Sequence, residues 1–104
     1  MSRFTLATDA DTHPDILAAL SQSDDTWIRM RVAENPSTAP KTLAVLGVDK
    51  DDVIRLLVAK NPNTPPQTLV RLRHGADHPT LFRIAQNRNT PYRIWVDRYG
   101  RVLP

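Results

Sequence analysis

The sequence predicts an all-α fold, an α-solenoid of about four two-helix repeats, because one pattern of residues returns every 26 positions. The recurring residues are Ala7, Ala33, Ala59 and Ala85; Thr12, Thr38, Thr64 and Thr90; and Asn35, Asn61 and Asn87, with Asp9 in the first asparagine position. A fixed period of this length is typical of stacked units, each too small to bury its own apolar face. The 104 residues equal four periods, which predicts one domain with units near 1–24, 25–50, 51–76 and 77–104.

Each unit is predicted to hold two helices, because its apolar residues follow helical spacing in two separate segments. In the second unit Trp27, Met30 and Ala33 indicate the first helix, and Leu43 and Leu46 indicate the second. Equivalent positions are apolar in nearly every unit, so we expect them to form a continuous core. These ladders are Phe4, Met30, Leu56 and Phe82; Leu6, Val32, Val58 and Ile84; Leu17, Leu43, Leu69 and Trp95; and Leu20, Leu46 and Leu72.

Aspartate and asparagine mark the two ends of the first helix. Asp25, Asp51 and Asp77 precede it in successive units, where a carboxylate accepts free N–H groups and suits the positive end of the helix dipole. The helix is expected to stop at an asparagine, which tolerates the left-handed conformation, before a proline that cannot extend it. These pairs are Asn35-Pro36 and Asn61-Pro62.

Threonine and proline are predicted to begin the second helix. Thr12, Thr38, Thr64 and Thr90 each offer an N-cap hydroxyl, and a proline follows within the first turn, where its missing N–H is tolerated. In the first unit Asp15 lies three residues after Thr12, an arrangement close to a capping box. The high proline content therefore reflects helix boundaries and not disorder.

The string from Val58 to Pro66, VAKNPNTPP, followed by Leu69 and Leu72, resembles the leucine-rich repeat variant family, with weaker copies at 32–40 and 84–91. The resemblance implies a right-handed superhelix in which α-helices alternate with short 3₁₀ helices, so the second helix of some units is expected to be 3₁₀. It also implies a role in molecular interaction. Some members hold an iron–sulfur centre on a cysteine cluster, but this chain has no cysteine, so we expect no cofactor.

Charge is distributed unevenly along the chain. Residues 1–52 carry five Lys/Arg against nine Asp/Glu, a net charge of −4, and residues 53–104 carry nine against two, a net charge of +7. Three interpretations stay open: drift of solvated surface charge, weak head-to-tail self-association, or an anionic partner at the basic end. The residues that would serve the third are Arg71, Arg73, Arg83, Arg88, Arg93, Arg98 and Arg101.

Arginines recur in the first helices as two columns. Arg29 and Arg55 occupy one position of successive units; Arg31 and Arg83 occupy another, which Leu57 interrupts. Such columns can hold an extended partner, but the favoured interpretation is that they pair with the cap aspartates of their own or a neighbouring unit. The candidate partner-binding residues are Arg29, Arg31, Arg55, Arg83, Arg88, Tyr92, Arg93 and Arg98.

The last unit departs from the pattern and carries aromatic residues among arginines. Tyr92, Trp95 and Tyr99 share helical spacing, and together with Arg93 and Arg98 they could stack bases or anchor a protein. The favoured alternative is that Trp95 caps the last layer of the core. At the other end, residues 1–7 are expected to supply only the later part of a first helix.

No catalytic or metal-binding motif accompanies the repeat. His74 and His78 are four residues apart, but Gly75 and Pro79 disfavour a helix that holds both, so we expect no metal site. The sequence has no bilayer-spanning run and no signal segment, which predicts a cytoplasmic protein without membrane contact. We therefore expect a non-enzymatic scaffold for protein or peptide interaction; the alternative is nucleic-acid binding by the basic C-terminal half.

Overall fold

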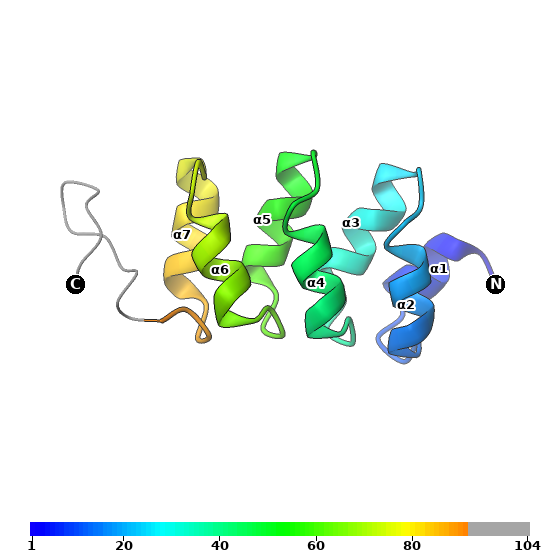
Figure 1. The fold of residues 1–104 in the computed structure, drawn as a ribbon. Helices are drawn as coiled ribbons and strands as arrows, with labels where there is room; N and C mark the ends of the chain where they lie inside the picture. Colours follow the sequence, from blue (N-terminus) through cyan, green and yellow to red (C-terminus); the bar gives the residue numbers. More distant parts are fainter. Residues whose placement is uncertain (92–104) are drawn as a thin grey trace.

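The structure is a computed structural model that describes residues 1–91 of the chain. This part of the chain contains seven α-helices and no β-strand, which confirms the all-α prediction (Figure 1). The helices are α1 (Arg3–Thr8), α2 (Pro14–Leu20), α3 (Thr26–Glu34), α4 (Pro40–Leu46), α5 (Asp52–Lys60), α6 (Pro66–Leu72) and α7 (His78–Gln86).

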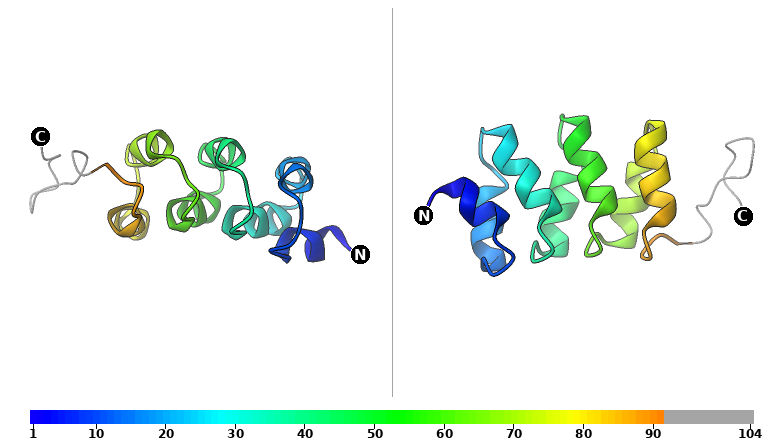
Figure 2. Two further views of the ribbon diagram at one scale, coloured as in Figure 1. Left: turned by 90° about the horizontal axis from the view of Figure 1, so that it is seen from below. Right: turned by 180° about the vertical axis from the view of Figure 1, so that it is seen from behind.

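The helices lie in two layers. Helices α1, α3, α5 and α7 stand side by side in one row, which we call the first-helix layer, and α2, α4 and α6 form the second-helix layer (Figure 2). Each helix of the first layer contacts the next one in that row, and α1 and α7 lie at opposite ends (Figure 1). The chain therefore crosses from one layer to the other at each turn while it advances along the row.

Aspartates begin the first helices, as predicted. Asp25 accepts a hydrogen bond from the Trp27 N–H at 2.9 Å, and Asp51 accepts one from the Val53 N–H at 2.8 Å. Asp77 does the same at the start of α7. These carboxylates satisfy N–H groups that have no partner within the helix.

The threonines, in contrast, do not cap the second helices, and that prediction is wrong. The N-cap residues of α2, α4 and α6 are His13, Ala39 and Pro65, and the Asp15 N–H donates to His13 Nδ1 and not to Thr12. Instead, each threonine hydroxyl donates to the carbonyl six residues earlier at 2.6 Å. The pairs are Thr12 with Leu6, Thr38 with Val32, Thr64 with Val58 and Thr90 with Ile84.

A proline explains this role of threonine in the central units. The Val32 carbonyl would accept the N–H of residue 36 if the helix continued, but Pro36 has none; the same holds for Val58 and Pro62. The Val32 and Val58 carbonyls each accept the N–H of the following asparagine, and the threonine hydroxyl supplies a second donor to these carbonyls. Thr38 and Thr64 are accordingly fully buried.

The second helices in residues 1–91 are α-helices, so the 3₁₀ conformation is wrong for α2, α4 and α6. In α4 the Leu43 N–H donates to the Ala39 carbonyl at 3.1 Å, and the Gly47 N–H donates to the Leu43 carbonyl at 2.8 Å. Both bonds span four residues, as in an α-helix. Seven residues that begin with proline at the first helical position are long enough to close these bonds.

The asparagines end the first helices, but not in the left-handed conformation. Asn35, Asn61 and Asn87 have φ between −71° and −74°, and no residue other than glycine within 1–91 has a positive φ. The extended backbone aims each side chain at the preceding unit. Asn61 Nδ2 donates to the carbonyls of Ala33 at 2.9 Å and Asn35 at 3.0 Å. The asparagines thus form a hydrogen-bonded ladder along the stack.

The core lies between the two layers. Its ladders from the first helices include Val32, Val58 and Ile84, and those from the second helices include Leu17 and Leu43. The predicted ladder of Phe4, Met30, Leu56 and Phe82 lies largely outside it, because Phe4 and Phe82 are exposed and Leu56 is half-buried; Met30 is half-buried and packs against the core. Trp95 lies outside the described residues.

Candidate interaction surface

The side of the first-helix layer that faces away from the second layer carries apolar side chains. Trp27 is 62% exposed, Phe82 57% and Phe4 43%. Successive residues of an α-helix are about 100° apart, so Trp27 points away from the side that buries Ile28 and Val32, whereas Met30 lies between the two sides and still packs against the core. We call this surface the outer face; it comprises Phe4, Trp27, Met30, Arg31, Val53, Leu56, Leu57, Lys60, Phe82 and Arg83.

Two of the predicted partner-binding arginines lie on the outer face. Arg31 pairs with Glu34 and places its guanidinium over the ring of Phe4, 5.4 Å from the ring centre, so it joins α3 to α1. Arg83 donates to Gln86 Oε1 at 3.2 Å and lies 5.7 Å from the ring centre of Phe82. Cation and ring therefore occur together at both ends of the described layer.

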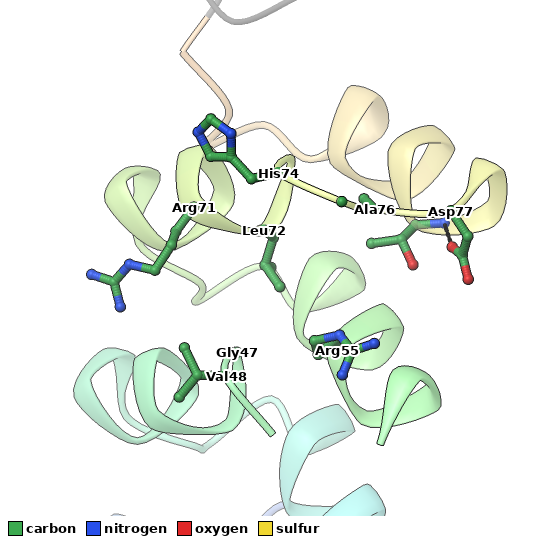
Figure 3. A pocket seen from close by; sticks show the side chains of 10 residues that line it. Gly47, Val48, Arg55, Arg71, Leu72, His74, Ala76 and Asp77 are labelled. Atoms are coloured by element: carbon green, nitrogen blue, oxygen red, sulfur yellow. Dashed lines mark hydrogen bonds between the residues drawn. The ribbon is translucent and has the colours of Figure 1, made fainter. Parts of the chain in front are cut away.

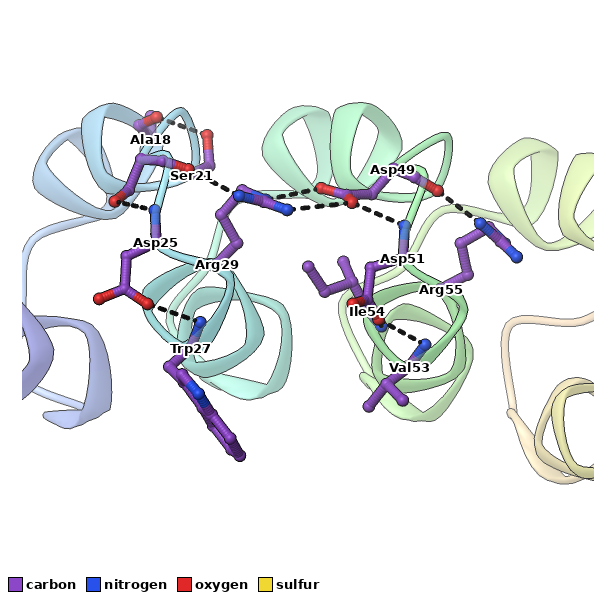
Figure 4. Close-up of polar contacts among 11 residues, drawn as sticks. Ala18, Ser21, Asp25, Trp27, Arg29, Asp49, Asp51, Val53, Ile54 and Arg55 are labelled. Atoms are coloured by element: carbon purple, nitrogen blue, oxygen red, sulfur yellow. Dashed lines mark hydrogen bonds and ion pairs between the residues drawn. The ribbon is translucent and has the colours of Figure 1, made fainter.

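The other arginine column lies at a different place, where the second helices connect to the first. Arg29 is buried, and its Nε donates to Asp49 Oδ2 at 2.9 Å while Nη1 donates to the Ser23 carbonyl at 2.8 Å (Figure 4). Arg55 Nη1 donates to the Asp49 carbonyl at 2.6 Å. The favoured pairing with an aspartate holds for Arg29, but the partner is Asp49 and not a helix cap.

Asp49 is held as a carboxylate by these contacts. Burial by itself raises the pKa of Asp49, but the Asp51 N–H and the Arg29 guanidinium donate hydrogen bonds to it and outweigh burial, so its pKa lies below the ordinary value. Both partners of this ion pair expose only 11% of their side chains. Arg29 and Asp49 therefore tie α3 to the turn after α4 within the second unit.

Basic residues border hollows at the C-terminal ends of α5 and α7. One hollow of about 110 Å³ is lined by Lys60, Arg83, Gln86 and Asn87. A second, of about 430 Å³, shares Lys60, Gln86 and Asn87 and adds Arg88. A third hollow of about 320 Å³ lies beside Phe4, at the other end of the layer. The outer face is thus uneven, and its basic residues gather toward α7.

The remaining predicted residues lie either outside the described part of the chain or elsewhere in it. Tyr92, Arg93 and Arg98 lie outside the described residues, as do Tyr99 and Arg101. Arg71 is exposed on α6, and Arg73 has a buried Nε that finds no hydrogen-bond partner within residues 1–91. In that part of the chain no three His, Cys, Asp or Glu side chains gather as metal ligands, and no helix is long and apolar enough to cross a bilayer.

Sequence reasoning missed two features that the residues could have signalled. Trp27 falls on the opposite side of a helical wheel from Ile28 and Val32, so its exposure could have been read from the spacing. Asp49 occupies a position that is Ser23 in the preceding unit and Gly75 in the next, and this break in the period marks the ion pair with Arg29.

Comparison of the chain with protein-family models, with curated proteins and with solved structures finds no match.

Proposed function

We propose that this protein is a non-enzymatic helical-repeat scaffold that binds a protein or peptide through the outer face. The observation that carries the proposal is the exposure of Trp27, Phe82 and Phe4 on one surface. Large apolar side chains that gather on a surface mark interaction sites more often than they serve stability. Trp and Arg are also the residues that most often dominate the binding energy of interfaces.

The architecture behind this proposal is an α-solenoid of about four 26-residue units that forms a right-handed superhelix and is related to the leucine-rich repeat variant family. It is supported by the asparagine ladder, in which Asn35, Asn61 and Asn87 repeat one set of contacts at the interval of the sequence period. The α-helical second helices are a departure from that family's expected pattern.

The chemistry of the outer face indicates what kind of segment fits it. Its apolar side chains favour apolar residues in the partner. Lys60 and Arg83, together with the adjacent Arg88, favour acidic residues near the α7 end. The described residues 53–91 carry six Lys/Arg against one Asp, which extends this positive field. We therefore propose an extended or helical segment with apolar anchors and acidic flanks.

A peptide library displayed on phage and selected on the immobilised full chain tests this function. We expect enriched peptides to combine aromatic or aliphatic residues with Asp or Glu. Trp27→Ala and Phe82→Ala should each weaken their binding by about tenfold or more, as truncation of an interface anchor does. Because both side chains are exposed, the fold should persist, and circular dichroism checks it.

Val45→Ala is the matched control, since Val45 is 59% exposed on α4 of the second-helix layer. It removes an exposed apolar side chain of the opposite layer and should leave peptide binding unchanged. Enriched peptides that bind the Trp27→Ala/Phe82→Ala double variant as well as the wild type would contradict the proposal.

Nucleic-acid binding is the second candidate, favoured by the hollows that Lys60, Arg83 and Arg88 border. Neutralising phosphates with such residues releases counterions, so affinity should fall steeply as salt rises. Fluorescence anisotropy with duplex and single-stranded DNA and RNA across a salt series measures this. Absence of binding at the lowest salt concentration ends the second candidate and leaves the first untouched.

A further inference from the structure

A pocket of about 210 Å³ opens where the second, third and fourth units meet, apart from the outer face (Figure 3). The turns after α4 and α6 and the helix α5 enclose it. Its polar lining comes from Arg55, Arg71, His74 and Asp77, and its apolar lining includes Val48 and Leu72. A liquid water molecule occupies about 30 Å³, so the pocket has room for an acidic side chain.

The second unit contains an equivalent arginine that binds a carboxylate. Arg29 and Arg55 occupy equivalent positions, and each donates through Nη1 to a carbonyl six residues earlier, that of Ser23 or Asp49. Arg29 also donates through Nε to the carboxylate of Asp49. The residue equivalent to Asp49 in the next unit is Gly75, so Arg55 has no corresponding carboxylate (Figure 4).

The space that this missing carboxylate leaves is open. A Cβ built on Gly75 would meet no heavy atom within 4 Å, and the glycine has a φ of +73°, which gives its turn a different course from the turn at Asp49. No carboxylate of residues 1–91 lies within ion-pair distance of Arg55. Asp77 lines the same pocket; it accepts the Thr80 N–H at 2.9 Å as the cap of α7, and its pKa is lowered first by the hydrogen bonds from Thr80 and then by the charge of Arg55.

We propose that this pocket binds a carboxylate from outside the chain, with Arg55 as its principal partner. The carboxylate takes the role toward Arg55 that Asp49 plays toward Arg29. Arg71 at the edge of the pocket adds positive charge that offsets the charge of Asp77. A guanidinium presents paired N–H donors that match a carboxylate, and charge-assisted bonds of this kind are the stronger ones.

Titration of the uniformly ¹⁵N-labelled full chain, followed by NMR at constant ionic strength, tests the proposal. The probes are acetate, inorganic phosphate, and short capped peptides with one central Glu or one central Gln. We expect saturable shifts of the Arg55 Nε–H and of the Gly75 and Ala76 amides with acetate and the Glu peptide, but none with the Gln peptide. If acetate binds as tightly as the Glu peptide, a free carboxylate is sufficient for binding. If the Glu peptide binds more tightly, the ligand is a carboxylate side chain within a peptide segment.

Two variants complete the experiment. Arg55→Gln should weaken carboxylate binding by roughly tenfold or more, since it removes the charged donor. Arg3→Gln makes the same change of charge at an exposed position outside the pocket and outside the outer face, and should leave binding unchanged. Shifts that do not saturate, a Gln peptide that binds equally, or phosphate that binds more tightly than either carboxylate overturn the proposal. The outer-face variant Phe82→Ala should not affect this titration, so the two proposals fail independently.

Discussion

Asn61 shows how one side chain joins two units of the stack. It is 2% exposed, its Nδ2 donates to two carbonyls of the preceding unit, and its Oδ1 accepts the Asn63 N–H at 2.9 Å. This arrangement needs a side chain that donates two hydrogen bonds and accepts one. Among side chains of this size, only the asparagine amide does both. This explains why asparagine returns at the interval of the period.

We expect Asn61→Asp to destabilise the protein by about 2 kcal/mol or more, because two buried carbonyls lose their donors and face a carboxylate. Urea unfolding followed by circular dichroism measures the loss. Gln67→Glu makes the same change from amide to carboxylate at an exposed position and should cost less. Equal losses for the two variants would show that the ladder contributes nothing specific.

The Arg29–Asp49 pair adds a contribution that depends on pH. Because the pKa of Asp49 is lowered on folding, its stabilising effect is complete above the ordinary aspartate pKa of about 3.9 and is lost as pH falls through the lowered value. At neutral pH, Asp49→Asn should cost about 3 kcal/mol, since it leaves Arg29 buried without an anion.

Unfolding free energies of wild type and Asp49→Asn between pH 2 and pH 7 check this, with the difference expected to shrink toward the acid end. Asp24→Asn is the control, because Asp24 is exposed. A difference that stays constant with pH would show that the lost stability does not come from the carboxylate.

At the scale of the element, the helices are too short to be stable alone. The longest in residues 1–91 have nine residues, whereas isolated helices below about 12–15 residues are marginal in water. Their ends therefore depend on caps and on contacts with neighbouring helices. Asp51 illustrates this, since it accepts hydrogen bonds from both the Val53 and Ile54 N–H groups.

Asp51→Ala should lower stability by about 1 kcal/mol through the loss of this cap. Asp52→Ala removes the adjacent carboxylate without breaking a cap bond and should cost less. Thermal unfolding of both variants gives the comparison. A larger loss for Asp52→Ala would assign the effect to general charge near the helix end and not to the cap.

The boundaries of the first helices were predictable from the sequence because they depend on local chemistry. Asp25 and Asp51 cap these helices, and Pro36 and Pro62 cannot continue them. The role of threonine was not, since Thr38 donates backward to the Val32 carbonyl of the preceding helix instead of capping the next helix. The exposure of Phe4 and Phe82 was missed because an apolar ladder by itself does not say which side of a helix another layer covers.

At the scale of the whole molecule, charge changes sign along the sequence. The first 52 residues carry a net charge of −4 and the remainder +7, which supports the proposal of weak head-to-tail association. Asp9 limits its strength. It stands where later units have asparagine, and a carboxylate cannot donate to the carbonyls of a preceding unit as Asn35 does.

Sedimentation at two salt concentrations tests this association. We expect a raised average mass near 10 mM salt, where charges interact over about 30 Å, and a monomer near 1 M, where the range is about 3 Å. A monomer at both concentrations ends the idea. Association that grows with salt would instead indicate contact through the apolar outer face.

For the described residues, the sequence alone determined that the fold is helical and where the first helices of the units begin and end, because caps, prolines and a repeated spacing act within a few residues. Only the tertiary structure decided that Trp27 and Phe82 face solvent, that Asp49 neutralises Arg29, and that Arg55 is left beside an open pocket. These features depend on which layer lies behind a helix and on contacts between residues that are distant in the sequence. A local sequence pattern predicts neither.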